Sequence, residues 1–133
     1  MLGNFQQSQL RIEIQASNAV LRESILNPQE FSRWMWPQQF STDLPVQLTP
    51  GLTFTSQLGL IKIKHEVLAI SEQEAKFLLS EGIDGIHEWI WGEGWVQSLL
   101  EGVSVLPLNL GQTIALYRLR QFAEARQQKL AST

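Results

Sequence analysis

Residues 86–103 read IHEWIWGEGWVQSLLEGV, and their pattern is the strongest signal of structure in the chain. In 86–91 the side chains of His87, Trp89 and Trp91 share one face of an extended chain, because successive strand residues point to opposite faces. The short loop 92–94, Gly-Glu-Gly, then leads into a second β-rich run over 95–103. Two such runs joined by a short glycine-containing loop predict a β-hairpin. No helix follows the glycines directly, so the loop does not resemble a phosphate-binding turn.

The preceding residues extend this hairpin into a larger antiparallel sheet. In 60–71, LIKIKHEVLAIS, positions 61, 63, 65, 67 and 69 form a face that is apolar apart from His65. The run 74–81 places Ala75, Phe77 and Leu79 on one face, and the turn 82–85 connects it to 86–91. Residues 52–57 are also rich in β-formers. Residues 38–50 are predicted to be irregular or weakly extended, because the prolines at 45 and 50 do not suit a central strand.

Short helices are predicted near the N-terminus. Residues 10–16, LRIEIQA, alternate as a half-buried strand does. Ser17 can cap a helix that carries apolar residues at helical spacing and stops at Asn27-Pro28. Pro28 suits the first turn of a second short helix over 28–35, which Pro37 ends.

One long helix is predicted over 108–129. Leu110, Ile114 and Tyr117 recur at helical spacing, as do Leu116 and Leu119. About 22 residues give a helix of roughly 33 Å, which is long enough to cross a sheet. Its apolar stripe needs a partner, and the inward face of the sheet is the only large one. A curved sheet around such a helix leaves a space in which a ligand can bind.

Composition narrows the class of protein. The 133 residues suit one domain over 1–133, and a net charge of −3 gives no basic field for nucleic acid. The absence of cysteine excludes disulfides, thiolate nucleophiles and cysteine-bound zinc. The stretch MLGNFQQSQL has neither a basic start nor an apolar core, and no apolar run reaches membrane-spanning length. We therefore expect a cytoplasmic protein without an integral membrane segment.

Essentially the whole chain, including the long helix at its end, resembles a known superfamily. The strand LRIEIQAS, the helix NAVLRESIL and the segment NPQEFSRW (27–34) are similar to the opening of START-like (SRPBCC, helix-grip) domains. From residue 83 onward the chain also resembles a cyanobacterial branch of unassigned function. The resemblance implies an α+β helix-grip fold: a curved antiparallel β-sheet wrapped around a long C-terminal α-helix, with two short helices after the first strand. It implies a cavity but no particular reaction, since lipid-transfer domains, receptors and polyketide cyclases share this fold.

The candidate cavity residues are those that the pattern turns inward. They are Trp34, Ile63, His65, Phe77, His87, Trp89, Leu116 and Leu119. The aromatic residues of the hairpin can instead be simple cross-strand packing. His65 can be a hydrogen-bonded structural residue, or both histidines can contact a polar group of the ligand or act as acid and base. No zinc-binding spacing exists, and we expect no metal and no cofactor.

Three functions remain open on this sequence. The first is a binding or carrier protein for an apolar or amphipathic small molecule, and the second is a cyclase- or dehydratase-like enzyme using cavity histidines. The third is a protein-interaction module with a filled core and an exposed patch over Trp34–Trp36. The acidic residues of the sheet region and the cations of 118–129 are read as solvated faces. A homodimer through the outer sheet face, at Leu78, Ile86 and Ile90, is a further possibility.

Overall fold

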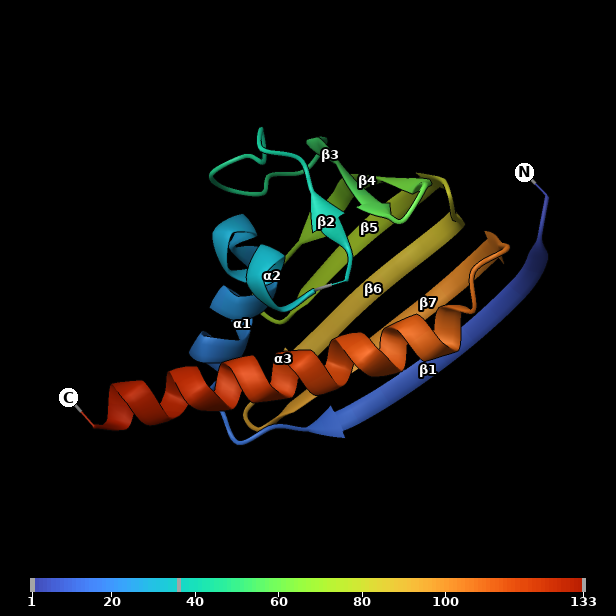
Figure 1. The fold of residues 1–133 in the computed structure, drawn as a ribbon. Coiled ribbons are helices and arrows are strands. Elements are labelled where there is room, and N and C mark those ends of the chain that lie inside the picture. Colours follow the sequence, from blue (N-terminus) through green and yellow to red (C-terminus); the bar gives the residue numbers. More distant parts are fainter. Residues whose placement is uncertain (1, 36, 133) are drawn as a thin grey trace.

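The computed structural model describes residues 2–35 and 37–132, so Trp36 of the predicted patch lies outside the described residues. The elements follow one another in the predicted order: a strand, two short helices, a meander of strands and a long helix (Figure 1). They are β1 (Asn4–Glu13), α1 (Asn18–Leu26), α2 (Pro28–Trp34), β2 (Gln39–Phe40), β3 (Thr53–Leu58), β4 (Ile61–Ile70), β5 (Glu74–Glu81), β6 (Asp84–Gly92), β7 (Trp95–Ser104) and α3 (Leu108–Ala131).

The strands form one antiparallel sheet of seven strands in the order β1-β7-β6-β5-β4-β3-β2. Figure 1 shows all three helices on the same face of this curved sheet, with α3 running across it. The helix-grip fold expected from the sequence is therefore confirmed. No helix of the described residues has both the length and the apolar character that crossing a membrane requires.

Alternation along the strands builds the core between sheet and helices. On β5 the side chains of Ala75, Phe77 and Leu79 are buried, as predicted. On β6 the residues Trp89 and Trp91 are buried, which follows the same period of two. The opposing layer comes from the buried stripe of α3, which includes Leu116, Leu119 and Ala123.

Two strands differ from the sequence-based prediction. β1 begins at Asn4 rather than at residue 10. The prediction missed its first half because the inward positions there carry the polar residues Gln6 and Ser8 instead of an apolar stripe. In β4 the pairing register with β5 shifts between Val67 and Ala69. An extra residue at such a bulge reverses the faces that follow it, so Ala69 is exposed and the predicted inward face ends at Val67.

The short helices begin where the caps were predicted. The Ser17 side chain accepts a hydrogen bond from the Val20 amide at 3.2 Å, and Asn27 accepts one from the Gln29 amide at 3.0 Å. Glu93, at the tip of the β6–β7 hairpin, accepts a bond from the Asn18 amide at 2.8 Å. A carboxylate at a helix N-terminus is favoured by the helix dipole, so the hairpin tip also fixes the start of α1.

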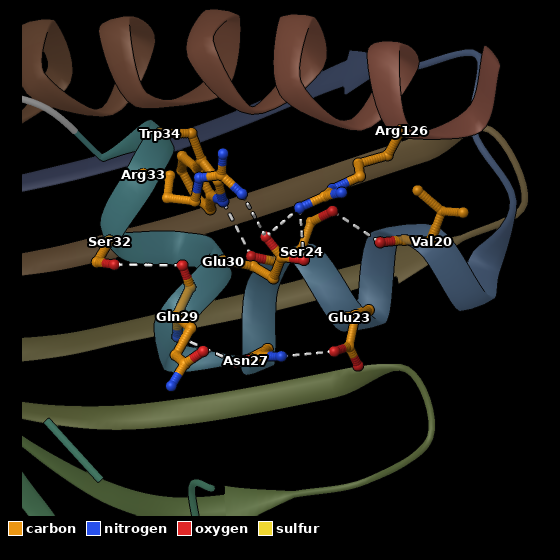
Figure 2. A network of polar contacts seen from close by, with 10 residues as sticks. All are labelled: Val20, Glu23, Ser24, Asn27, Gln29, Glu30, Ser32, Arg33, Trp34 and Arg126. Atoms are coloured by element: carbon orange, nitrogen blue, oxygen red, sulfur yellow. Dashed lines mark hydrogen bonds and ion pairs between the residues drawn. The ribbon is translucent and has the colours of Figure 1, made fainter. Parts of the chain in front are cut away.

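A polar network fastens α2 to the C-terminal half of α3. Arg126 of α3 donates to both carboxylate oxygens of Glu30, at 2.8 and 2.7 Å (Figure 2). The indole N–H of Trp34 donates to the Ser24 carbonyl of α1 at 2.9 Å. Paired Arg–carboxylate bonds fix both distance and orientation. The position of α2, which flanks the space under α3, is thus set by both other helices.

The first turn of α3 is capped by a residue from β1. Pro107 occupies the N-cap position and supplies no side-chain hydrogen bond. Instead, Gln6 accepts a bond from the Leu108 amide at 3.0 Å and donates to the Leu106 carbonyl at 2.8 Å. Gln6 therefore satisfies an amide that would otherwise lack a partner at the helix start.

Replacing this cap should destabilise the protein. We expect Gln6→Ala to lower the free energy of unfolding by about 2 kcal/mol, because both a cap and a part-buried carbonyl lose their partner. The neighbouring Gln7→Ala is the matched control, since Gln7 makes only an exposed bond to Glu101 and should change stability by less than about 0.5 kcal/mol. Urea unfolding of both variants measures the difference, and equal midpoints would contradict the capping role.

Candidate functional site

A cavity of about 270 Å³ lies between the sheet and the first turns of α3. Its described lining comes from the strands β2 to β7, from α1, α2 and the chain that follows α2, and from 106–115. Of the candidate residues, Ile63, His65, Phe77, His87 and Trp89 line this cavity. The cavity therefore borders the sheet face to which both His65 and His87 belong.

The remaining candidates lie beyond the cavity, among residues of the packed core. Trp34, Leu116 and Leu119 are almost fully buried, and the described lining does not include them. The ring of Trp34 meets Trp89 edge-on at a centroid distance of 6.0 Å. α3 also contacts α1 and α2, and in its second half Arg126 bonds to Glu30 of α2. The open space lies instead under residues such as Gln112 and Ala115, one or two turns earlier.

The rim of the cavity is apolar and partly exposed. Met35 and Pro37 line it on one side, and Leu110 and Ile114 line it on the other. Leu110 is 57% exposed and Ile114 is 41% exposed. These side chains join the cavity lining to solvent-facing surface, so this rim offers an entry route for an apolar molecule.

His65 is held by aromatic and polar neighbours. Its ring stacks on Phe54 at a centroid distance of 4.6 Å with an angle of 3° between the planes. Its Nε2 lies 2.8 Å from the Ser56 hydroxyl, which in turn accepts a bond from the side-chain amide of Gln38. The imidazole therefore has a fixed plane and one nitrogen engaged by the protein.

His87 has a parallel arrangement on β6. Its Nε2 lies 2.8 Å from the hydroxyl of Ser98 on β7. The side-chain amide of Gln112 donates to both the hydroxyl and the carbonyl oxygen of Ser98, each at 2.9 Å. The amide oxygen of Gln112 accepts a bond from the Ser8 hydroxyl at 2.5 Å. This chain of bonds ties β6, β7, β1 and α3 together at the cavity wall.

Burial keeps both imidazoles neutral. Desolvation lowers the pKa of His65 from 6.5 to about 4. Desolvation, and then the proximity of His65, lowers the pKa of His87 from 6.5 to about 3. The described lining residues include no lysine, arginine, aspartate or glutamate that would offset these effects. Near neutral pH the cavity thus presents two uncharged imidazole rings in an apolar wall.

Sequence reasoning missed the polar residues that orient the histidines. Ser98 lies between the buried Val96 and Leu100 on the inward face of β7, and Gln112 lies one turn before Leu116 on the buried stripe of α3. A polar residue within an apolar stripe needs a hydrogen-bond partner when buried. The polar residues within these apolar stripes could therefore have been noticed in the sequence. Their hydrogen-bond partners could not, because these depend on the tertiary structure.

The acidic residues of the sheet region make structural or surface contacts. Glu88 lies 4.0 Å from Lys76, and Glu101 accepts a bond from Gln7 at 3.0 Å. Within residues 2–35 and 37–132 no group of three or more His, Asp or Glu side chains is placed to hold a metal ion. These contacts favour the solvated-face interpretation of the carboxylates.

Comparison with known proteins supports the fold. No family model and no curated protein matches the chain. Among solved structures, CV1439 from Chromobacterium violaceum is 15% identical with a TM-score of 0.72, covering 89% of this chain and 96% of its own. An AHSA1-like protein from Aeromonas hydrophila is 14% identical with a TM-score of 0.69, covering 91% and 94%. The Aha1 dimer of Colwellia psychrerythraea is 13% identical with a TM-score of 0.63, covering 90% and 96%. At these identities the likeness defines the class, a helix-grip domain, and not the ligand.

Proposed function

We propose that this chain is a START-like domain over 1–133 that binds or carries a compact apolar or amphipathic molecule between its sheet and α3. The observation that carries the proposal is an apolar cavity of about 270 Å³ with two imidazoles in its wall. Small-molecule sites are mostly apolar, with a few polar groups that orient the ligand. The cytoplasm is the compartment that we propose for it.

The size of the cavity limits the ligand. A cavity of about 150 Å³ can hold benzene, and typical ligand sites begin near 300 Å³. A cavity of about 270 Å³ therefore suits a molecule of one or two rings better than a long lipid chain. We expect the apolar part to lie against Phe77 and Trp89, which both face the cavity.

The direction of the histidine pKa shifts favours binding over acid–base catalysis. A general acid or base works best when its pKa lies near the working pH. The pKa values of about 4 and about 3 lie well below neutrality, so each imidazole is a weak base at pH 7. Neutral imidazole is instead suited to donate or accept a hydrogen bond. This argument ranks the carrier above the cyclase- or dehydratase-like alternative.

An open cavity also weighs against the module with a filled core. The outer face of the sheet nevertheless keeps apolar surface, since Leu78 is 40% exposed and Ile86 and Ile90 are half-buried. A homodimer through this face stays a prediction. Light scattering tests it by comparing the molar mass of Leu78→Lys with that of the wild-type protein. A lower mass for the variant alone would support it.

Native mass spectrometry of the freshly purified protein tests the carrier proposal. We expect a discrete added mass that organic solvent extracts as a small apolar compound. If neither a co-purified compound nor any added ring compound binds, the carrier proposal is wrong.

Filling the cavity should remove binding without unfolding the protein. Ala115 lines the cavity from α3, so Ala115→Phe should occupy part of the space and lower the affinity for naphthalene at least about tenfold, because the lost space excludes the ligand. The control is Ala125→Phe on the exposed surface of the same helix. Isothermal titration calorimetry measures the naphthalene affinity of both variants, after thermal melts have shown that the two are equally stable. Equal affinities in the two variants would place the ligand elsewhere.

A further inference from the structure

The two cavity histidines are each held by the same kind of polar arrangement. In each, a glutamine amide donates to a serine hydroxyl, and that hydroxyl meets the histidine Nε2. The residues are Gln112, Ser98 and His87 on one side of the cavity and Gln38, Ser56 and His65 on the other. We call these two sets the Gln–Ser–His triplets. They occur on different strands and use glutamines from different parts of the chain.

The first triplet determines which nitrogen of His87 carries the proton. The amide nitrogen of Gln112 also faces the carbonyl oxygens of Ser98 and Ser8, at 2.9 and 3.2 Å, so it acts as a donor. The Ser98 hydroxyl cannot donate to that nitrogen, and Ser98 is fully buried. Leaving a buried hydroxyl hydrogen without an acceptor is costly. The hydroxyl therefore donates to His87 Nε2, and the imidazole proton is on Nδ1.

The second triplet leads to the same tautomer at His65. The Gln38 amide nitrogen donates to Ser56, and the Ser56 side chain is 1% exposed. Its hydroxyl hydrogen again has His65 Nε2 as its acceptor at 2.8 Å. Among the described residues, the hydrogen bonds of both rings run through Nε2 alone. Each ring thus keeps one N–H donor, on Nδ1, that no described protein atom accepts.

The two donors lie on opposite sides of one strand. His65 on β4 pairs with Leu79 of β5, and His87 on β6 pairs with Phe77 of β5. The rings are therefore separated by two strand spacings and by two residues along the strand. Strand spacings of about 4.8 Å and rises of about 3.3 Å place their Cα atoms roughly 12 Å apart. One compact molecule in the cavity can meet both rings.

We propose that the ligand is an uncharged ring compound with two hydrogen-bond acceptors, of the diketone or quinone type, whose oxygens accept from Nδ1–H of His65 and His87. This inference rests on the proposed carrier function and adds the chemical class of the ligand. A ligand that presents only donors would leave both N–H groups without acceptors in an apolar wall. An anion would meet no cationic side chain among the described lining residues, so its desolvation would be uncompensated.

The tautomers can be tested without any ligand. Nitrogen NMR of protein labelled at histidine, recorded at pH 7, distinguishes protonated Nδ1 from protonated Nε2. The chain has only two histidines, so assignment is simple. We expect protonated Nδ1 and unprotonated Nε2 in both rings. Protonation at Nε2 in either ring would overturn the proposal.

A matched series of ring compounds tests the ligand class. Naphthalene has no acceptor, 1-tetralone has one carbonyl, 1,4-naphthoquinone has two, and 1-naphthoate is an anion of similar size. The chain has no cysteine thiol to react with the quinone. Because each step adds one hydrogen bond, we expect the affinity to rise about tenfold from naphthalene to tetralone and again to naphthoquinone. We expect 1-naphthoate to bind more weakly than naphthoquinone.

Variants of His87 connect the affinity to the donor. His87→Asn keeps an amide donor near the position of Nδ1 and should retain the preference for naphthoquinone. His87→Leu should lower naphthoquinone affinity about tenfold more than it lowers naphthalene affinity, because only naphthoquinone bonds to the lost donor. If the leucine variant does not fold, the wild-type protein with labelled histidines gives the same test. Binding of naphthoquinone should shift both Nδ1–H signals, and the absence of that shift would refute the proposal.

The outcomes separate this inference from the carrier proposal. If naphthalene binds as tightly as naphthoquinone, the carrier proposal stands and the two-acceptor ligand is wrong. If the anion binds tightest, the uncharged class is wrong. If no compound of the series binds but another compound co-purifies, the carrier proposal stands and the two-acceptor ligand is wrong; if nothing binds or co-purifies, both proposals fail.

Discussion

The free energy of unfolding should fall by about 4 kcal/mol between pH 7.5 and pH 5, because two buried histidines take up protons on unfolding. In the unfolded chain each titrates near its ordinary pKa of 6.5, whereas in the folded chain the pKa values are about 4 and about 3. Between these values the unfolded state binds more protons. Stability is therefore fully present above pH 6.5 and declines as the pH falls toward the folded-state pKa values.

Urea unfolding at pH 7.5, 6 and 5 measures this dependence. The chosen window lies above the ordinary pKa of carboxyl groups, and the chain has two histidines and no cysteine, so the side chains that titrate there are few. His87→Gln should remove about half of the decrease, because one proton fewer is taken up. An unchanged pH dependence in that variant would show that His87 is not held neutral in the folded protein.

Gly85→Ala should lower the free energy of unfolding by more than about 3 kcal/mol, which would reach the upper range for single substitutions. Gly85 lies opposite Gly102 where β6 pairs with β7. A Cβ at position 85 would lie 1.9 Å from the Glu101 carbonyl oxygen and 2.6 Å from the Gly102 Cα. Both are backbone atoms, so the clash can be relieved only by moving β6 and β7 apart.

The control for this substitution has the opposite expected sign. A Cβ at Gly111 in α3 meets nothing within 4 Å. Gly111→Ala should therefore raise the free energy of unfolding by up to about 1 kcal/mol, because alanine has the higher helix propensity. Denaturant melts of the two variants provide the comparison. Similar effects of the two substitutions would contradict the close approach of β6 and β7.

Local signals predicted most of the architecture. The caps at Ser17 and Asn27 depend only on residues within a few positions, and the alternation of 74–81 reports burial directly. The first half of β1 escaped prediction because Gln6 faces inward to bond with residues about 100 positions away. The bulge after Val67 escaped for a similar reason, since register is a property of two strands and not of one.

The candidate site was predictable in part. The strand period places His65 and His87 on the inward face, where the structure also has them. The same reasoning could not tell how far along α3 the cavity extends, because that depends on where α1 and α2 press against the helix. It also could not find the Gln–Ser–His triplets. The members of one come together only when α3 packs on β6 and β7, and those of the other only when the chain before β2 packs on β3 and β4.

The pairing of β1 with β7 has a consequence for the time course of folding. Gln6 and Ser104 are 98 residues apart, yet they are bonded neighbours at the end of the sheet. On the ribosome, at roughly 5–20 residues per second, β1 waits several seconds before its partner strand is synthesised. The hairpins from β3 to β7 can pair with their neighbours as they emerge, whereas β1 must close the longest loop. Because Gln6 also caps α3, the start of the helix and the last strand should be secured in one late step, and until then the β1-facing edge of β7 is open to other chains.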